Sequence, residues 1–353
     1  MGLTKKVAMS AFAAAIAFAA TSAEAKRERW KLHSAWGSSV PHLGTSALRY
    51  SKNIERMSGG DFKLKFFEPG ALVPANEGFD AVSKGSLETA WTTAGYDVGK
   101  YPALAFFTAV PFGPSMGEYF AWKKYGGGDD LQREIYAKHD IHQMDCFAIG
   151  PETSGWFKEE IKSLEQLRGM KMRFFGLGAR VMQKIGVSTQ LLAGGDIFPA
   201  LEKGVIDATE FSMPAMDIKY GFYQIAKNNY FPGWHQQVSV SQLLVNMGKW
   251  NGLDDSKKAL LEVGCGDSIH ATYAETEYVN PFAMVEMGEK FGVVTRRWTD
   301  DQIAVFEKAW NEVIAEDSAK DPLFKKVHDS YAKFRKAYAK WGAAQALKPT
   351  YLK

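Results

Sequence analysis

Three charged side chains lie at the ends of predicted strands in the second half of the chain, where they could bind or activate a small molecule. Arg173 ends one apolar stretch, and Glu152 and Glu210 each follow another. In open α/β sheets, ligands bind beyond the carboxyl ends of the strands, and a planar guanidinium group matches a carboxylate with two parallel hydrogen bonds. Arg173 is therefore a candidate carboxylate-binding residue. A structural ion pair between Arg173 and Glu210 is the alternative.

The two glutamates allow two kinds of chemistry. Paired carboxyl groups can act as a general acid and base, and carboxylate oxygens are also the ligands that hard cations such as Ca²⁺ prefer. The residues alone favour a simpler interpretation, in which Glu152 and Glu210 are solvated loop side chains.

Common enzyme motifs are absent from the sequence. It contains no G-x-S-x-G, H-E-x-x-H or Walker A pattern,. Among seven scattered histidines, only His235 is a candidate, because it lies in the turn Pro232-Gly233-Trp234-His235-Gln236 between predicted lobes. We expect a binding protein and no enzyme activity; an exported enzyme with Glu152 and Glu210 as its acid–base pair is the alternative.

One short sequence pattern occurs twice. Residues 62–70 read FKLKFFEPG and residues 170–178 read MKMRFFGLG, so that Lys65 in the first copy corresponds to Arg173 in the second. Each copy is followed by a second similar segment, and both copies predict a strand, a helix closed by glycine and another strand. Two similar units in one chain predict two lobes, with Arg173 beside the cleft between them.

The hydrophobic pattern alternates between strands and helices. The first half predicts strands at 30–36, 62–67 and 87–92, with helices at 41–57 and 76–84. The second half predicts strands at 143–150, 170–175 and 205–210, with helices at 163–167, 178–185 and 196–203. This order favours parallel sheets covered by helices. From 251 to 341 the apolar residues recur at helical spacing.

The N-terminal residues 1–25 have the features of a secretory signal peptide. Lys5 and Lys6 precede an apolar run that ends before Ala23-Glu24-Ala25, and this run is too short to span a membrane,. We therefore expect an exported protein, most plausibly in a bacterial periplasm. A net charge of +3 gives no reason to expect nucleic acid or an anionic membrane surface as a partner,.

The chain contains two cysteines, Cys146 and Cys265. An oxidising compartment would permit a disulfide, but both residues lie in apolar surroundings and the sequence does not give their separation. We expect two buried free thiols, with a disulfide as the alternative.

From Trp30 to Trp341 the chain resembles the solute-binding proteins of tripartite ATP-independent periplasmic (TRAP) transporters, of the DctP type. The segments 169–173 (GMKMR) and 195–210 (GDIFPALEKGVIDATE) carry this resemblance. Three further segments resemble the branch that binds 2-oxo acids and lactate: FFTAVPFG at 106–113, GWF at 155–157 and PGW at 232–234.

This resemblance implies an α/β fold of the two-lobe, Venus-flytrap type with a helical C-terminal region. We assign residues 26–150 and about 238–275 to the first lobe. Residues 151–237 and about 276–353, with the C-terminal helices, form the second. The implied function is to bind a small organic monocarboxylate, such as pyruvate or another 2-oxo acid or lactate, and to deliver it to the TRAP membrane permease subunits. Aromatic acids, sugar acids and sulfonates are alternative ligands, and helices at 301–341 could join a homodimer.

The resemblance also implies the binding residues. Arg173 binds the substrate carboxylate, Tyr96 supplies a second polar contact, and Glu152 and His235 lie beside the substrate. Trp36, Phe174 and Trp234 are candidates for the apolar walls, and a place in the hydrophobic core is the alternative for each. A bridging metal ion is implied near Glu152, Glu210, the carbonyl of Phe211 and Gln236.

The chain departs from the family pattern around this metal. Glu152 stands where a sodium-binding relative has glutamine, Gln236 stands where that relative has an acidic residue, and Phe211 stands where tryptophan is common. Two glutamates near one cation favour Ca²⁺, with Na⁺ as the alternative.

Overall fold

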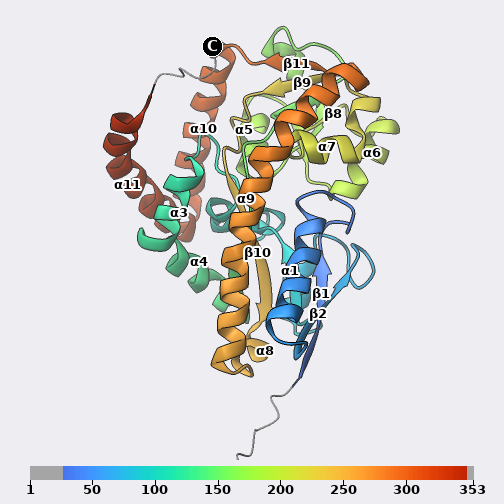
Figure 1. Cartoon of the computed structure of the whole chain (residues 1–353). Helices are drawn as coiled ribbons and strands as arrows, with labels where there is room; N and C mark the ends of the chain where they lie inside the picture. The colour runs from blue at the N-terminus through green and yellow to red at the C-terminus, as the bar shows by residue number, and fades with distance from the viewer. Residues whose placement is uncertain (1–26, 348–353) are drawn as a thin grey trace, which may run out of the picture.

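Residues 27–347 are described by a computed structural model, in which two β-sheets, each with its own helices, lie one above the other (Figure 1). The predicted signal peptide at 1–25 lies outside the described residues. No helix among residues 27–347 combines the length and the hydrophobicity that crossing a membrane requires.

The first sheet has five strands in the order β2-β1-β3-β10-β4. Their bounds are β1 (Glu28–Ser34), β2 (Phe62–Phe67), β3 (Thr89–Thr92), β4 (Ile141–Ile149) and β10 (Ser239–Asn246). Strands β1, β2 and β3 are parallel, but β10 is antiparallel to both of its neighbours. The prediction of a parallel sheet is therefore wrong for β10, because this strand returns from the second lobe through the turn at 232–238.

The second sheet has six strands in the order β11-β9-β5-β8-β6-β7. Their bounds are β5 (Gly155–Phe157), β6 (Lys171–Arg173), β7 (Ser188–Gln190), β8 (Ala208–Thr209), β9 (Asn228–Phe231) and β11 (Val294–Arg297). Strand β6 is parallel to β7 and β8, whereas β5 is antiparallel to β8 and β9. Only part of this sheet has the predicted parallel order.

Helices cover both sheets. The first lobe carries α1 (Gly44–Met57), α2 (Gly78–Ser83), the 3-10 helices η1 (Ala94–Asp97) and η2 (Pro102–Phe107), α3 (Met116–Tyr125), α4 (Gly128–Ala137) and α8 (Met247–Asn251). The second carries η3 (Leu164–Leu167), α5 (Gly176–Lys184), α6 (Gly194–Glu202), α7 (Pro214–Tyr220), η4 (Phe222–Gln224) and α10 (Asp300–Lys320).

The long helix α9 (Asp255–Phe291) spans both lobes, as Figure 1 shows in orange. Its first half packs on β4 and α1, and its second half packs on α7. Two threonines of α9 accept hydrogen bonds from the end of β4, Thr272 from Ala148 N at 2.9 Å and Thr276 from Gly150 N at 3.2 Å. The helix therefore supports the strand that leads to Glu152.

The last helix, α11 (Pro322–Gln345), packs mainly on the first lobe, against η2, α3 and α4, and also contacts α10 of the second lobe. Its Phe324 ring lies 4.8 Å from that of Phe106, and its Ser330 accepts a hydrogen bond from Trp122 Nε1 at 3.2 Å. The predicted assignment of 276–353 to the second lobe leaves out these first-lobe contacts, in which aromatic residues of the first lobe cover the apolar face of α11.

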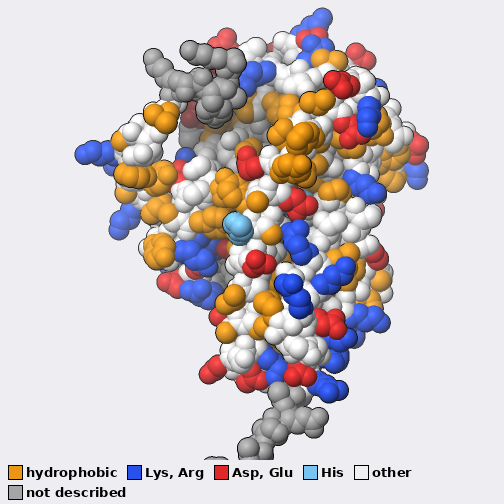
Figure 2. Space-filling view, in the orientation of Figure 1, with side chains coloured by type: hydrophobic (Ala, Val, Ile, Leu, Met, Phe, Trp, Pro, Cys, Tyr) orange, Lys and Arg blue, Asp and Glu red, His pale blue; other side chains and the backbone are white. Residues whose placement is uncertain are grey.

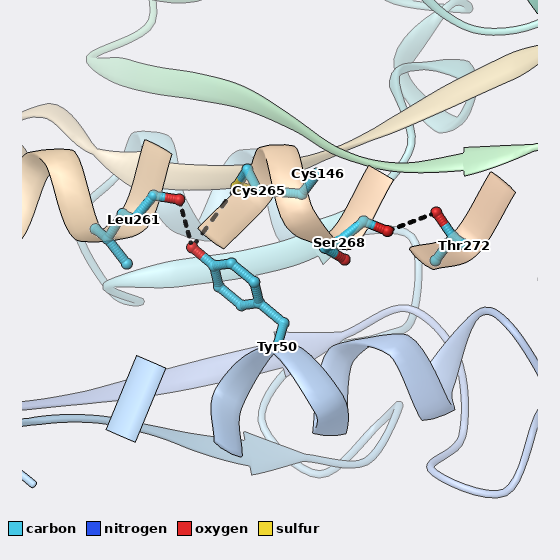
Figure 3. Close-up of a disulfide and its surroundings, with 6 residues drawn as sticks. All are labelled: Tyr50, Cys146, Leu261, Cys265, Ser268 and Thr272. Carbon is cyan, nitrogen blue, oxygen red and sulfur yellow. Dashed lines mark hydrogen bonds between the residues drawn. A yellow bond between two sulfur atoms is a disulfide. The ribbon is translucent and has the colours of Figure 1, made fainter. Parts of the chain in front are cut away.

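Cys146 of β4 and Cys265 of α9 form a disulfide (Figure 3), so the expectation of free thiols is wrong. The sequence could not show that α9 lies along β4. Tyr50 of α1 lies beside the bond: its hydroxyl donates to Leu261 O at 3.1 Å and lies 3.6 Å from Cys265 Sγ. The disulfide thus ties the two-lobe helix to the first sheet.

Candidate functional site

A small cavity lies between the two lobes. It is lined by Trp36, Leu43, Thr93, Tyr96, Ile149, Ser239 and Ser241 from the first lobe, and by Glu152, Arg173, Phe175, Phe211, Ser212 and Gln236 from the second lobe and the turn at 232–238. Its free volume is about 30 Å³, room for roughly two water molecules. The lobes touch beside it, since Phe175 packs directly on Gly95. This is a closed arrangement suited to a small ligand.

Arg173 is the positively charged residue of the cavity wall, at the end of β6. The side chain is 1% exposed, its Nη1 donates to the carbonyl and to Oε2 of Glu210 at 2.8 and 2.9 Å, and its Nε donates to Leu192 O at 3.2 Å. Within residues 27–347, Nη2 has no hydrogen-bond acceptor. The guanidinium is thus held rigidly while one nitrogen, with two hydrogens, stays available to a ligand.

Glu210 follows β8 and is fully buried. Its Oε2 accepts hydrogen bonds from Arg173 and from Phe175 N, the latter at 3.1 Å, whereas its Oε1 has no hydrogen-bond partner among the described residues. Burial alone would raise the pKa of Glu210, but the positive charges of Arg173 and His235 outweigh it and hold the pKa below its usual range,. Glu210 is therefore a carboxylate with one oxygen to spare.

Glu152 lies in the loop between β4 and β5. Its backbone N donates to Gln236 O at 3.2 Å, and Gly233 approaches so closely that a Cβ there would lie 2.1 Å from Glu152 O. Ser212 donates to Oε1 at 2.8 Å, and Oε2 has no hydrogen-bond partner in the described part of the chain. Burial raises the pKa of the Glu152 carboxyl, and His235 offsets this only in part.

His235 stands between the two glutamates. Its Nε2 lies 3.5 Å from Oε2 of Glu152 and 3.5 Å from Oε1 of Glu210, distances long for hydrogen bonds but short for an electrostatic interaction,. Burial lowers the pKa of His235, but the two glutamates more than compensate and raise it to about 9. A charged imidazole is thus favoured between the two carboxylates.

The unpartnered oxygens fit a metal ion. Glu152, Glu210 and His235 each present an atom within 4.8 Å of the others, and all three are buried. Oxygens of Glu152 and Glu210 that lack partners are the ligands a hard cation requires,. Gln236 and Phe211 line the same cavity, and the amide nitrogen of Gln236 has no partner among residues 27–347, so an amide flip that presents the oxygen instead would break no hydrogen bond of this nitrogen,.

The sequence analysis missed Asp217, which is fully buried on α7. Its Oδ1 accepts from Ser212 N at 3.1 Å, and its Oδ2 accepts from Trp156 Nε1 at 2.7 Å and from Thr153 Oγ1 at 3.4 Å. It therefore joins the loop of Glu152 to the loop after Glu210. No local pattern marks this residue, because two of its three partners, Trp156 and Thr153, are 61 and 64 positions away in the sequence.

The aromatic candidates divide into two groups. Trp36 and Tyr96 line the cavity, and burial raises the pKa of Tyr96 to about 12, so its phenol stays a neutral donor. Phe174 and Trp234 do not line it: their rings pack together 5.9 Å apart, and Trp234 stacks on Phe306 of α10. The residue that does line it is Phe175, which strand alternation could have indicated, since it lies two positions after Arg173,.

Comparisons with known proteins agree on one family. Residues 33–321 match the DctP family, described as bacterial extracellular solute-binding protein, family 7. A monocarboxylate 2-oxoacid-binding periplasmic protein of Nostoc is 34% identical over 321 residues, which cover 90% of this chain and 87% of the relative.

Solved structures of TRAP solute-binding proteins are also similar. One from Bordetella bronchiseptica, a dimer with calcium and picolinate in an active site, has 33% identity and a TM-score of 0.88 over 90% of this chain and 95% of that one. One from Pseudoalteromonas atlantica, with sodium and pyruvate, has 28% identity and a TM-score of 0.87 over 91% and 97%. One from Colwellia psychrerythraea, with calcium and pyruvate, has 29% identity and a TM-score of 0.86 over 91% and 98%.

These matches confirm the predicted two-lobe α/β fold and the predicted family. Since the family match spans most of the chain, the protein belongs to the DctP family of bacterial extracellular solute-binding proteins and is a solute receptor of the TRAP transporter type.

Proposed function

We propose that this protein is a periplasmic receptor that closes its lobes around a small monocarboxylate, a 2-oxo acid such as pyruvate or else lactate, and delivers it to a TRAP membrane permease. The observation that carries this proposal is the unused Nη2 of Arg173 in the wall of a small cavity between the lobes. A ligand that contacts both lobes would shift the population from open to closed.

The charges of the cavity favour a single carboxylate. Arg173 is the one arginine or lysine among the lining residues, and two glutamates, Glu152 and Glu210, are buried beside it. A second carboxylate on the ligand would be buried without a cation of its own, which is unfavourable. The small free volume also favours an acid of a few carbon atoms.

The proposed metal lies beside Glu152 and Glu210, with the Gln236 side chain and the Phe211 carbonyl as further oxygen ligands. Two glutamates and a bound acid carry three negative charges, and Arg173 carries one positive charge, so a divalent cation balances the sum when His235 is neutral and a monovalent cation balances it when His235 is charged,. The two carboxylate ligands favour Ca²⁺ over Na⁺. Both cations occur with pyruvate in similar proteins.

A thermal-shift screen tests the proposal. Small monocarboxylates, aromatic acids, sugar acids and sulfonates are added to the chelator-treated protein, with Ca²⁺, with Na⁺ or with neither. We expect pyruvate or lactate to raise the melting temperature most in Ca²⁺, since a ligand that binds only the folded state stabilises it. If no monocarboxylate shifts the melting temperature with either cation, the proposal is wrong. Product formation from a bound acid, followed by NMR, would favour the enzyme alternative.

We also propose self-association through α9. Tyr278, Phe282 and Val285 lie on one helix face and are 70%, 62% and 56% exposed,. Figure 2 shows hydrophobic side chains gathered over the part of the molecule where Figure 1 draws the upper half of α9. Such patches favour protein contacts, and one similar protein is a dimer. Sedimentation should show a dimer at micromolar concentration that Phe282→Lys converts to monomer.

A further inference from the structure

The first-lobe wall of the cavity contains hydroxyl groups where hydrophobic side chains are expected. Strand β10 is buried from Ser239 to Val245, with only Asn246 half-buried, so both of its faces are covered. Ser239 and Ser241 lie on the same face as Leu243, which belongs to the hydrophobic core,. Both serines line the ligand cavity, across from Arg173.

Ser241 has no hydrogen-bond partner in the part of the chain that the structure describes, although it is fully buried. A buried hydroxyl without a partner is unfavourable, and native proteins avoid it unless water or a ligand supplies the missing bond. Because Ser241 lines the cavity, its partner can come from the cavity.

A group of three other hydroxyls provides a second unused hydrogen-bond donor, in addition to Ser241. Thr93 and Ser239 line the cavity, and each lies 3.0 Å from the buried Thr108 hydroxyl, so three O–H groups share two hydrogen bonds. One proton is therefore left over. Since Thr108 has no other acceptor among the described residues, the spare proton belongs to Thr93 or Ser239, at the cavity wall.

We propose that Ser241 and this hydroxyl chain form a subsite for a second, neutral oxygen of the ligand, so that the preferred substrate is a monocarboxylate with a hydroxyl group on the carbon farthest from the carboxylate. The inference rests on the proposed function, in which Arg173 binds the carboxylate from the opposite lobe. Two donors at one wall fit an oxygen that accepts hydrogen bonds. The oxygen is neutral, because no lining residue of the first lobe carries a positive charge to balance a second carboxylate.

Two isosteric acids test this subsite. 3-Hydroxypyruvate and 2-oxobutyrate differ by a hydroxyl in place of a methyl group, and calorimetric titration in saturating Ca²⁺ gives their affinities. We expect the wild-type protein to bind 3-hydroxypyruvate at least about tenfold more tightly, as one additional hydrogen bond and a satisfied serine would provide. In Ser241→Ala that ratio should fall towards one, mainly because 3-hydroxypyruvate binds more weakly.

Ser268→Ala is the matched control. Ser268 on α9 is also a buried serine whose hydroxyl lacks a partner among the described residues, but it lies away from the cavity, so the ratio should stay at its wild-type value. A wild-type ratio near or below one overturns the subsite, as does a tenfold ratio that survives in Ser239→Ala/Ser241→Ala. If neither acid binds the wild-type protein with either cation, the proposed function itself is wrong. If the two acids bind with equal affinity and their binding depends on Arg173, only the subsite is wrong.

Discussion

Replacing Arg173 with lysine should weaken monocarboxylate binding by about 10- to 150-fold and leave the protein folded. Lysine keeps a positive charge beside Glu210, which is fully buried and would otherwise lose its ion pair at 2.9 Å. It cannot keep the two Nη1 bonds to Glu210 and also supply the free Nη2 to a ligand,. Hydrogen bonds to charged groups contribute about 1.5–3 kcal/mol, and each 1.4 kcal/mol is tenfold in affinity.

Calorimetric titration with pyruvate in saturating Ca²⁺ measures this effect. Arg180→Lys is the control: Arg180 lies in the same lobe and pairs with Asp317 at 3.0 Å, but its side chain is 40% exposed and lies outside the cavity. That substitution should leave the affinity within about twofold, because exposed ion pairs contribute little. If Arg173→Lys changes the affinity less than threefold at an unchanged melting temperature, Arg173 does not bind the carboxylate.

Three further outcomes are expected. Burial lowers the pKa of His235, but its glutamate neighbours raise it to about 9 overall. The stabilisation of the fold by protonated His235 is therefore complete below pH 6.5 and is lost as pH rises through about 9,. The melting temperature of the chelator-treated protein should fall across this window, and it should fall less in His235→Gln. Gly95→Ala should hinder closure and weaken ligand binding about tenfold, because its Cβ would lie 1.8 Å from Phe175 Cζ, whereas Gly99→Ala, with open space around its Cβ, should leave the affinity unchanged,. Removing the disulfide with Cys146→Ala/Cys265→Ala should lower the free energy of unfolding by about 2–4 kcal/mol in denaturant titration, since the bond closes a loop with a sequence separation of 119,; equal stability of the two proteins would contradict this.

Local sequence patterns were sufficient for the elements that position Arg173. The repeated strand–helix–strand pattern predicted a strand at 62–67, which are the observed bounds of β2, and it predicted Arg173 near the end of the strand that is observed as β6. Strand periodicity and helix termini depend on neighbouring residues, so a single sequence can indicate them. The same periodicity, carried past Arg173, would have selected Phe175 over Phe174 for the cavity wall.

Features that depend on distant segments were not accessible in this way. The antiparallel placement of β10, the packing of α11 on the first lobe and the Cys146–Cys265 bond each join residues about 90 or more positions apart. Asp217 belongs to the same class, since its role comes from the loops it connects. Each of these contacts is decided by tertiary packing, which local propensity does not encode.

The charge balance of the site makes the identity of the metal measurable through protons. Without ligand, Glu152 and His235 together hold one proton at neutral pH. The net charge of these two residues with Arg173 and Glu210 is therefore zero, whichever of Glu152 and His235 carries that proton,. A monocarboxylate bound with Na⁺ adds no net charge, so the proton can stay. The same acid bound with Ca²⁺ adds one positive charge to a site where uncompensated charge costs several kcal/mol, and the proton should leave. Calorimetry at pH 7 in buffers of different ionisation enthalpy should therefore show about one proton released per acid bound in Ca²⁺ and none in Na⁺. Equal release in both salts would show that the cation does not displace the proton of this pair.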